Sequence, residues 1–295
     1  MKVLEIQDLN KRYGRIQAVN QLSLSIEKGM VYGILGPNGS GKTTTLGIVL
    51  GILKANSGSF QWFEGKYGDN PRRHLGALLE TPNFYPYLSA VDNLDIVAHI
   101  KRVKQPRMDE LLELVNLKHR KNSKFKTYSL GMKQRLAIAA AMIGDPDVLI
   151  FDEPTNGLDP QGIAEVRETL LKIASRGKTV IMASHILDEV EKVCSHVAIL
   201  KNGKLLATGP IGSILNDHIV IELGCNELEK LQSILGEDQR IHAITRTKEH
   251  LLLEVSPQLI AAEINQKAAE AGIYLSHLVT KTQSLEEEFL AITKE

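Results

Sequence analysis

The sequence contains little cysteine and no long apolar run. Cys194 and Cys225 are the only cysteines among 295 residues, and they form no CxxC pair, which favours reduced thiols over a disulfide framework or a cysteine-bound metal. The longest apolar runs, such as residues 136–143, are far shorter than the roughly 20 residues that cross a bilayer. The N-terminal segment MKVLEIQDLNKRYG has no apolar core of the signal-peptide type. If the protein acts at a membrane, another polypeptide should cross it.

The sequence also lacks an excess of charge of either sign. It has 35 lysines and arginines against 35 aspartates and glutamates, so its formal net charge is zero. A protein that binds DNA or RNA through its backbone phosphates usually carries a basic field. We therefore expect no nucleic acid among the partners.

The first two-thirds of the chain alternate short apolar runs with helical patterns. Such alternation predicts an α/β domain around a largely parallel sheet, here residues 1–215. The runs 31–35, 148–151 and 179–183 are expected to be central strands, because parallel strands covered on both faces need no polar alternation. Between the first two lies a helical insertion at about residues 82–143, where Ser89 and Asp92 are spaced as a capping box.

Residues 216–295 have a different pattern. Strand-like and helical segments follow one another in the order β-α-β-β-α-β, which is typical of a small ferredoxin-like α+β unit. We find no catalytic constellation in this segment, and we expect it to serve in regulation or dimer contact.

A glycine-rich motif follows the strand at residues 31–35 and precedes a helical segment. It reads GPNGSGKT and matches the phosphate-binding pattern G-x-x-x-x-G-K-[ST], in the strand–loop–helix context that this pattern requires. Backbone N–H groups of such a loop surround phosphate oxygens, and the N-terminus of the helix adds partial positive charge. Lys42 is expected to reach the β- and γ-phosphates of a bound nucleotide, and Thr43 to offer its hydroxyl to Mg²⁺. The expected nucleotide-binding residues of this loop are Gly36, Pro37, Asn38, Gly39, Ser40, Gly41, Lys42, Thr43 and Thr44.

Two carboxylates end the strand at residues 148–151. Asp152 at the carboxyl end of a parallel strand, beside a phosphate loop, is placed to bind Mg²⁺. Glu153 is the candidate general base for the attacking water. A lone acidic pair at a strand end is often only a solvated surface feature, so this interpretation depends on the phosphate loop.

Four segments, GPNGSGKTT, YSLGMKQR, VLIFDEPTNGLDP and ASH, occur in this order in one chain. Together they resemble the nucleotide-binding subunit of ABC transporters over roughly residues 1–215. The resemblance implies a P-loop ATPase that holds ATP and Mg²⁺ between two copies of the chain. It also implies a separate membrane-spanning permease, and therefore a cytoplasmic protein at the inner face of the cell membrane.

The resemblance also assigns roles to individual residues. Tyr13 would stack on adenine, although an isolated tyrosine is more often ordinary packing. His185 would sense the γ-phosphate and act with Glu153 and Lys42 in catalysis. Asp159 would lie in a loop that crosses the dimer interface. The segment Ser129, Leu130, Gly131 and Met132 occupies the place of the LSGGQ signature and would contact ATP bound to the partner copy.

Glu80 departs from the family pattern, which has glutamine at this position. An ionised glutamate only accepts hydrogen bonds, so Glu80 is expected to contact Mg²⁺ or its waters. Glutamate here, together with YSLGMKQRL, resembles exporters that confer bacitracin resistance or lantibiotic self-immunity. The aromatic residues that follow, Phe84, Tyr85 and Tyr87, fit either local core or a socket for a permease helix.

These patterns predict an ATP-hydrolysing subunit of an exporter of antimicrobial peptides or drug-like compounds. The alternative is a soluble ATPase of the same fold that acts on DNA or the ribosome. Such relatives generally carry two ATPase domains in tandem or a long coiled-coil insertion, and this sequence has neither. A non-hydrolysing regulatory module is disfavoured because Lys42, Asp152, Glu153 and His185 are all present.

Overall fold

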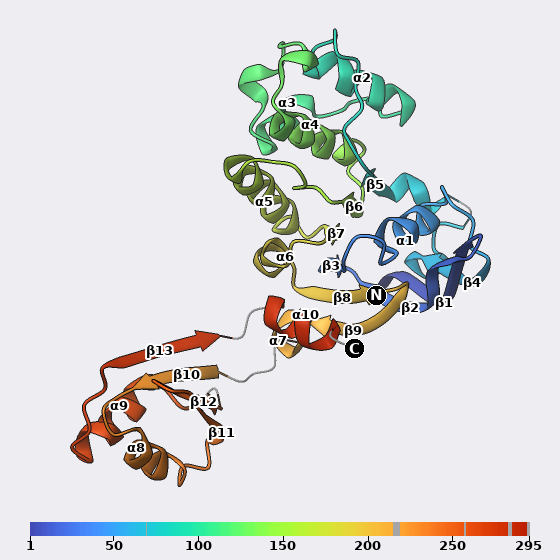
Figure 1. The fold of residues 1–295 in the computed structure, drawn as a ribbon. Coiled ribbons are helices and arrows are strands. Elements are labelled where there is room, and N and C mark those ends of the chain that lie inside the picture. The colour runs from blue at the N-terminus through green and yellow to red at the C-terminus, as the bar shows by residue number, and fades with distance from the viewer. Residues whose placement is uncertain (69, 215–218, 257, 283–284, 294–295) are drawn as a thin grey trace. The chain divides into compact units, whose positions relative to one another are not determined.

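The computed structural model describes residues 1–68, 70–214, 219–256, 258–282 and 285–293 (Figure 1). The chain forms two compact units, Met1–Pro210 and Ile211–Glu295. The boundary expected after residue 215 lies outside the described residues, within the segment 215–218, and the observed division falls earlier. Among the described residues, no helix combines the length and the apolar character that crossing a bilayer requires.

A six-stranded sheet forms the centre of the first unit, in the order β5-β6-β7-β3-β8-β9. All neighbours are parallel except β8 and β9, which pair antiparallel. The strands are β3 (Val31–Leu35), β5 (Leu75–Leu78), β6 (Val148–Asp152), β7 (Thr179–Ser184), β8 (His196–Lys201) and β9 (Lys204–Pro210). Every residue of β3, β6 and β7 is buried, which confirms the three central strands predicted from their continuous apolar runs.

A second, antiparallel sheet has the order β2-β1-β4. Its strands are β1 (Lys2–Tyr13), β2 (Ile16–Glu27) and β4 (Ser57–Trp62). Helix α1 (Lys42–Val49) follows β3, and its Leu46 belongs to one apolar cluster with Ile26 of β2 and Ile34 of β3. This shared core fixes the β1–β2 hairpin beside the loop that precedes α1.

The remaining helices of this unit are α2 (Ala90–Ile100), α3 (Met108–Leu114), α4 (Leu130–Met142), α5 (Pro160–Ala174) and α6 (Leu187–Val193). The predicted capping box begins α2, since the Ser89 hydroxyl accepts from the Asp92 N–H and the Asp92 carboxylate accepts from the Ser89 N–H. Helix α3 ends at Leu114, shortly before Asn116. Asn116 has a left-handed backbone (φ 54°), a conformation that stops helices and that asparagine tolerates.

The second unit has a four-stranded antiparallel sheet in the order β11-β12-β10-β13. Its strands are β10 (Ile219–Gly224), β11 (Ile241–Arg246), β12 (Leu251–Val255) and β13 (His277–Thr282), and its helices are α7 (Ile211–Ile214), α8 (Leu228–Leu235), α9 (Ala261–Glu270) and α10 (Leu285–Thr293). The element order from β10 to β13 and this strand order are those of the predicted ferredoxin-like unit. Ile221 and Leu253 pack on Leu231 of α8 and Ile264 of α9 within one apolar core, so α8 and α9 cover one face of the sheet.

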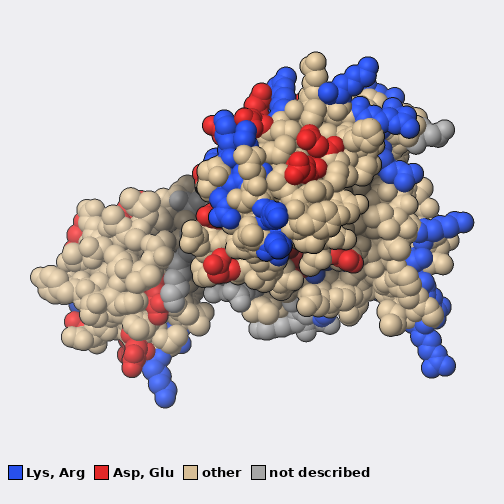
Figure 2. Space-filling model, turned by 90° about the horizontal axis from the view of Figure 1, so that it is seen from above, with Lys and Arg blue, Asp and Glu red and all other residues tan. Residues whose placement is uncertain are grey.

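The surface carries charges of both signs. On the face shown in Figure 2, lysine and arginine side chains are scattered among aspartate and glutamate side chains and do not join into one continuous patch. This distribution agrees with the balanced composition of the chain.

Candidate nucleotide site

The predicted phosphate loop connects the carboxyl end of β3 to the N-terminus of α1. Gly41 has a left-handed backbone (φ 103°), and a Cβ atom there would lie 2.3 Å from the carbonyl oxygen of Ala18 in β2. Only glycine satisfies both the conformation and this close approach. The glycine thus allows the β1–β2 hairpin to pack directly against the loop.

Lys42 is the first residue of α1, and its side chain is only 5% exposed. Its ammonium group donates to the carbonyl oxygens of Gly36, at 2.8 Å, and Pro37, at 3.3 Å. The same Nζ atom lies 3.3 Å from Oε1 of Glu153. Lys42 is therefore held over the loop and linked to the end of β6, more than a hundred positions away in sequence.

Glu153 follows β6 in a left-handed conformation, with φ of 49°. For a non-glycine residue, this backbone conformation costs of order 1–3 kcal/mol of free energy, and such strain is concentrated at functional sites. Its N–H donates to the Ala183 carbonyl at 2.9 Å, and its Oε2 lies 2.8 Å from Nδ1 of His185, just beyond β7. The structure thus joins the three predicted catalytic side chains, Lys42, Glu153 and His185, in one chain of contacts.

Asp152 is the last residue of β6 and is 5% exposed. Burial raises the pKa of its carboxyl group, and the negative charges of Glu153 and Glu80 raise this pKa further, whereas a hydrogen bond from Thr43 lowers it. Within the described part of the chain, Oδ1 of Asp152 and Oγ of Ser40 are buried without a hydrogen-bond partner. Mg²⁺ prefers oxygen ligands. The partnerless carboxylate oxygen of Asp152 and the neighbouring hydroxyl of Thr43 are ligands of this kind.

Glu80 lies just beyond β5, whose Leu78 is in register with Phe151 of β6. This parallel register places Glu80 at the same sheet edge as Asp152 and explains its effect on the pKa of Asp152. Glu80 is exposed and has a left-handed backbone, with φ of 60°. Sequence reasoning singled out Glu80 and Glu153 for their chemistry, but nothing in the sequence indicated their strained backbones.

Tyr13 ends β1 with a side chain that is 44% exposed. The Lys11 ammonium lies 4.9 Å from the centroid of its ring. Tyr13 belongs to the hairpin that packs against the phosphate loop, and the partly exposed ring offers a flat apolar surface on which a purine could stack.

A second cluster is built on the N-termini of α4 and α5. The Ser129 hydroxyl caps α4 by accepting from the Met132 N–H at 3.2 Å, and the Asp159 carboxylate caps α5 by accepting from the Gly162 N–H at 2.8 Å. A Cβ atom on Gly131 would lie 3.4 Å from Cα of Gly162, so glycine allows the two helix ends to approach closely. Leu130 is 45% exposed, while Ser129, Gly131, Met132 and Asp159 line one cavity of about 320 Å³.

Sequence reasoning missed Arg135, which ties this second cluster together. The side chain is buried, its Nη1 donates to the Val115 carbonyl at 2.7 Å, and its Nη2 lies 2.8 Å from Oε2 of Glu165 on α5. Arg135 lies in the apolar stretch QRLAIAAAM, and a charged residue at a buried helical position was the available signal.

Comparison with known proteins shows what the chain is similar to. The sequence pattern of the family described as ABC transporter matches residues 19–156. The bacitracin transport ATP-binding protein BcrA of Bacillus licheniformis is 35% identical over 296 residues, which cover 98% of this chain and 97% of that protein. The lantibiotic transport ATP-binding protein SrtF of Streptococcus pyogenes is 42% identical over 205 residues, which cover 69% of this chain and 89% of that protein.

Among solved structures, the dimeric post-hydrolysis state of the ATP-binding cassette MJ0796, bound to ADP and phosphate, is similar to this chain. It has a TM-score of 0.62 and 26% sequence identity, and the match covers 70% of this chain and 98% of that one. None of these comparisons supports the alternative of a soluble ATPase that acts on DNA or the ribosome.

Proposed function

The chain belongs to the ABC transporter ATP-binding proteins, which are ATPases, and on this premise we propose that it hydrolyses MgATP as a homodimer that drives a membrane permease. The observation that carries the proposal is the chain of contacts from Lys42 through Glu153 to His185. Phosphate release from MgATP by the purified chain tests the chemistry. Co-purification with a hydrophobic permease, as opposed to nucleic acid, tests the partner.

In the proposed reaction, the protein contributes positioning and electrostatic stabilisation. The loop amides and Lys42 bind the β- and γ-phosphates, and Tyr13 stacks on the adenine. Glu153 orients the attacking water and accepts its proton, and the contact between the His185 ring and the Glu153 carboxylate holds both groups at the γ-phosphate. The contacts of the Glu153 carboxylate with both Lys42 and His185, and the strained backbone of Glu153, support this assignment.

Thr43, Asp152 and Glu80 would hold Mg²⁺. The partnerless buried oxygen of Asp152 and its raised pKa support this ligand set, because a cation would stabilise the carboxylate that burial disfavours. When bound, Mg²⁺ would neutralise the charge that develops on the phosphoryl oxygens. Glu80, which lies beyond the neighbouring strand, would supply a negative charge that balances part of the positive charge of the metal ion.

Replacing Glu80 with alanine is expected to raise the Mg²⁺ concentration for half-maximal ATPase activity. A unit negative charge about 4 Å from a doubly charged cation contributes about 2 kcal/mol in water, which corresponds to roughly a thirtyfold shift. Mg²⁺ titration of phosphate release measures it, with the exposed Glu113→Ala as a matched loss of charge outside the site. An unchanged Mg²⁺ requirement and rate in Glu80→Ala would make Glu80 an ordinary polar loop residue.

The homodimer in this proposal is required by the chemistry. The N-terminus of α4 presents the backbone N–H groups of Leu130 and Gly131, a feature that binds anions, while the Met132 N–H donates to the Ser129 hydroxyl. We propose that this surface contacts the γ-phosphate of ATP bound by the partner copy. Asp159 would lie in the loop that crosses the dimer interface between the two sites. The dimeric form of the similar cassette MJ0796 supports this arrangement.

The permease and the exported compound are the finer part of the proposal. BcrA is named for bacitracin transport and SrtF for lantibiotic transport, which supports export of an antimicrobial peptide or a drug-like compound. The docking surface for the permease would include Tyr85 and Tyr87, which are 50% and 63% exposed with their ring centroids 5.9 Å apart. The chain would then act on the cytoplasmic face of the membrane.

A further inference from the structure

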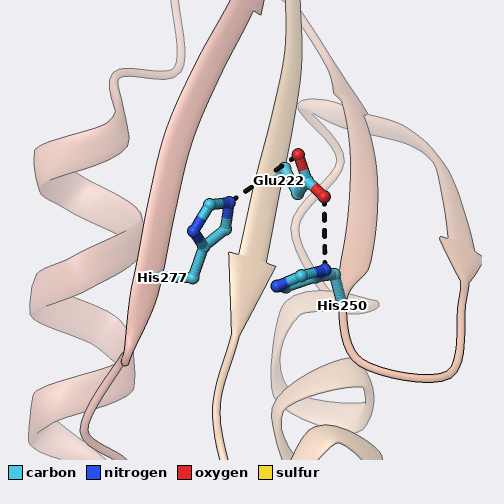
Figure 3. Close-up of side chains that lie close together, drawn as sticks. All are labelled: Glu222, His250 and His277. Carbon is cyan, nitrogen blue, oxygen red and sulfur yellow. Dashed lines mark ion pairs between the residues drawn. The ribbon is translucent and has the colours of Figure 1, made fainter.

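A cluster of two histidines and one glutamate lies on the sheet of the second unit. The alternation of side chains along β10 and β12 sends Ile221, Leu223 and Leu251 into the core under α8 and α9. Glu222 of β10 therefore lies on the opposite face, as does His250, which directly precedes Leu251. His277, the first residue of β13, points to the same place (Figure 3).

The strand register brings these side chains together. His277 pairs with Gly224 on one side, and His250 approaches Gly224 from the other. A Cβ atom on Gly224 would lie 2.9 Å from Cδ2 of His250 and 2.9 Å from Cβ of His277. The missing side chain thus makes room for two imidazole rings beside the carboxylate of Glu222.

The imidazole nitrogens of His250 and His277 lie close to the carboxylate oxygens of Glu222. Nδ1 of His250 lies 3.3 Å from Oε1 of Glu222, and Nε2 of His277 lies 3.7 Å from Oε2. One ligand atom from each of the three residues lies within 4.8 Å of the others. The ring centroids are 4.6 Å apart, and Nε2 of His277 is buried without a hydrogen-bond partner in the described ranges.

A histidine–carboxylate hydrogen-bond network is the simplest alternative for this cluster. A good N–H···O hydrogen bond measures about 2.7–3.2 Å, and both ion-pair distances exceed that range. Two protonated imidazoles would also repel each other at this ring separation, with one carboxylate to balance two positive charges. In contrast, ligand atoms about 2.0–2.1 Å from a tetrahedral zinc ion are spaced about 3.3 Å from one another.

We propose that Glu222, His250 and His277 bind a divalent transition-metal ion, with Zn²⁺ as the natural occupant. Two imidazole nitrogens and one carboxylate oxygen suit zinc, cobalt or nickel and select against Mg²⁺, which prefers oxygen ligands alone. On binding, the two ligand atoms that lie farthest apart approach each other by at most about 1.5 Å. A fourth coordination position remains for water. The ion joins β10, β13 and the residue that precedes β12, so its binding stabilises the second unit.

The experiment is a metal titration of the full-length chain, without nucleotide and with any affinity tag removed. Calorimetry with Zn²⁺ and visible absorption with Co²⁺ are expected to report one high-affinity ion per chain, which Zn²⁺ displaces from the cobalt form. Thermal unfolding is expected to shift upward with Zn²⁺ and not with Mg²⁺. Because all ligands are nitrogen or oxygen, the cobalt spectrum should lack a thiolate charge-transfer band.

Ligand variants decide the location of the ion. Loss of an outer-shell partner of a metal costs 10–100-fold in affinity, so Glu222→Gln, His250→Ala and His277→Ala should each weaken Zn²⁺ binding by more than about 100-fold. His242→Ala, an exposed position on β11, is the matched control and should leave the affinity unchanged. Circular dichroism of each apo variant verifies folding, and His250→Asn replaces any alanine variant that fails this check.

Three results would overturn the proposal: no Zn²⁺ binding by the folded wild-type chain, binding of equal affinity in the folded ligand variants, or a thiolate band that disappears in Cys225→Ser. The last result would place the ion on Cys225, which follows Gly224 and packs against the opposite, core side of the sheet.

Discussion

Replacement of Glu153 by glutamine is expected to reduce ATP hydrolysis by at least about 100-fold while ATP binding is retained. A positioned general base contributes typically 10²–10⁴-fold, and the amide of glutamine has nearly the same shape but accepts no proton. Glu153 is also the only group in the described site that contacts both Lys42 and His185. With binding intact and hydrolysis blocked, the ATP-bound dimer is expected to accumulate.

The measurement combines steady-state phosphate release with light scattering in the presence of MgATP. Glu168→Gln is the matched control, because this glutamate lies on the exposed face of α5 and pairs only with Lys172 in the described ion pairs. We expect the control to hydrolyse ATP at the wild-type rate. Hydrolysis at that same rate by Glu153→Gln would show that another group acts as the base.

Replacement of Lys42 by alanine is expected to abolish turnover and to weaken ATP binding by roughly 10–100-fold. Hydrogen bonds to charged groups contribute about 1.5–3 kcal/mol, and the variant loses the one ammonium that the loop carbonyls of Gly36 and Pro37 hold in place. The variant also leaves Glu153 without its cationic partner beside Asp152, which adds unbalanced negative charge where the phosphates bind.

Fluorescent-nucleotide titration and phosphate release measure these two effects. Lys66→Ala removes the same charge from an exposed position and should change neither quantity. Thermal unfolding of both variants shows whether the fold is retained. Unchanged nucleotide affinity in a folded Lys42→Ala chain would remove Lys42 from the proposed phosphate site.

Local sequence patterns were sufficient for the three central strands of the six-stranded sheet and for the loop that follows β3. The strands 31–35, 148–151 and 179–183 were predictable because continuous apolar runs between turn residues have few alternatives. The capping box at Ser89 was predictable because its two hydrogen bonds join residues three positions apart. The left-handed backbone of Asn116, which follows α3, was not predictable from the sequence. Many asparagines occupy helices, and only the packed chain fixes this conformation.

The candidate site depends on contacts between distant residues, which single-sequence patterns do not encode. The pairing of Lys42 with Glu153 and the effect of Glu80 on Asp152 follow from the strand order β5-β6-β7-β3. The resemblance to ABC transporters supplied the residues, but not the left-handed backbone of Glu153 or the ion pair of Arg135 with Glu165. The cluster of Glu222, His250 and His277 was not predicted for the same reason. These three residues become neighbours only through the antiparallel register of their strands.

The central claim is that two copies of the chain complete each site, with Ser129–Met132 of one copy at the ATP of the other. The most direct measurement is the rate of hydrolysis per subunit as a function of protein concentration, with the oligomeric state followed by light scattering at saturating MgATP. The account predicts that this rate rises with concentration and reaches a plateau as the dimer forms. A rate per subunit that is constant in samples that stay monomeric throughout would contradict it.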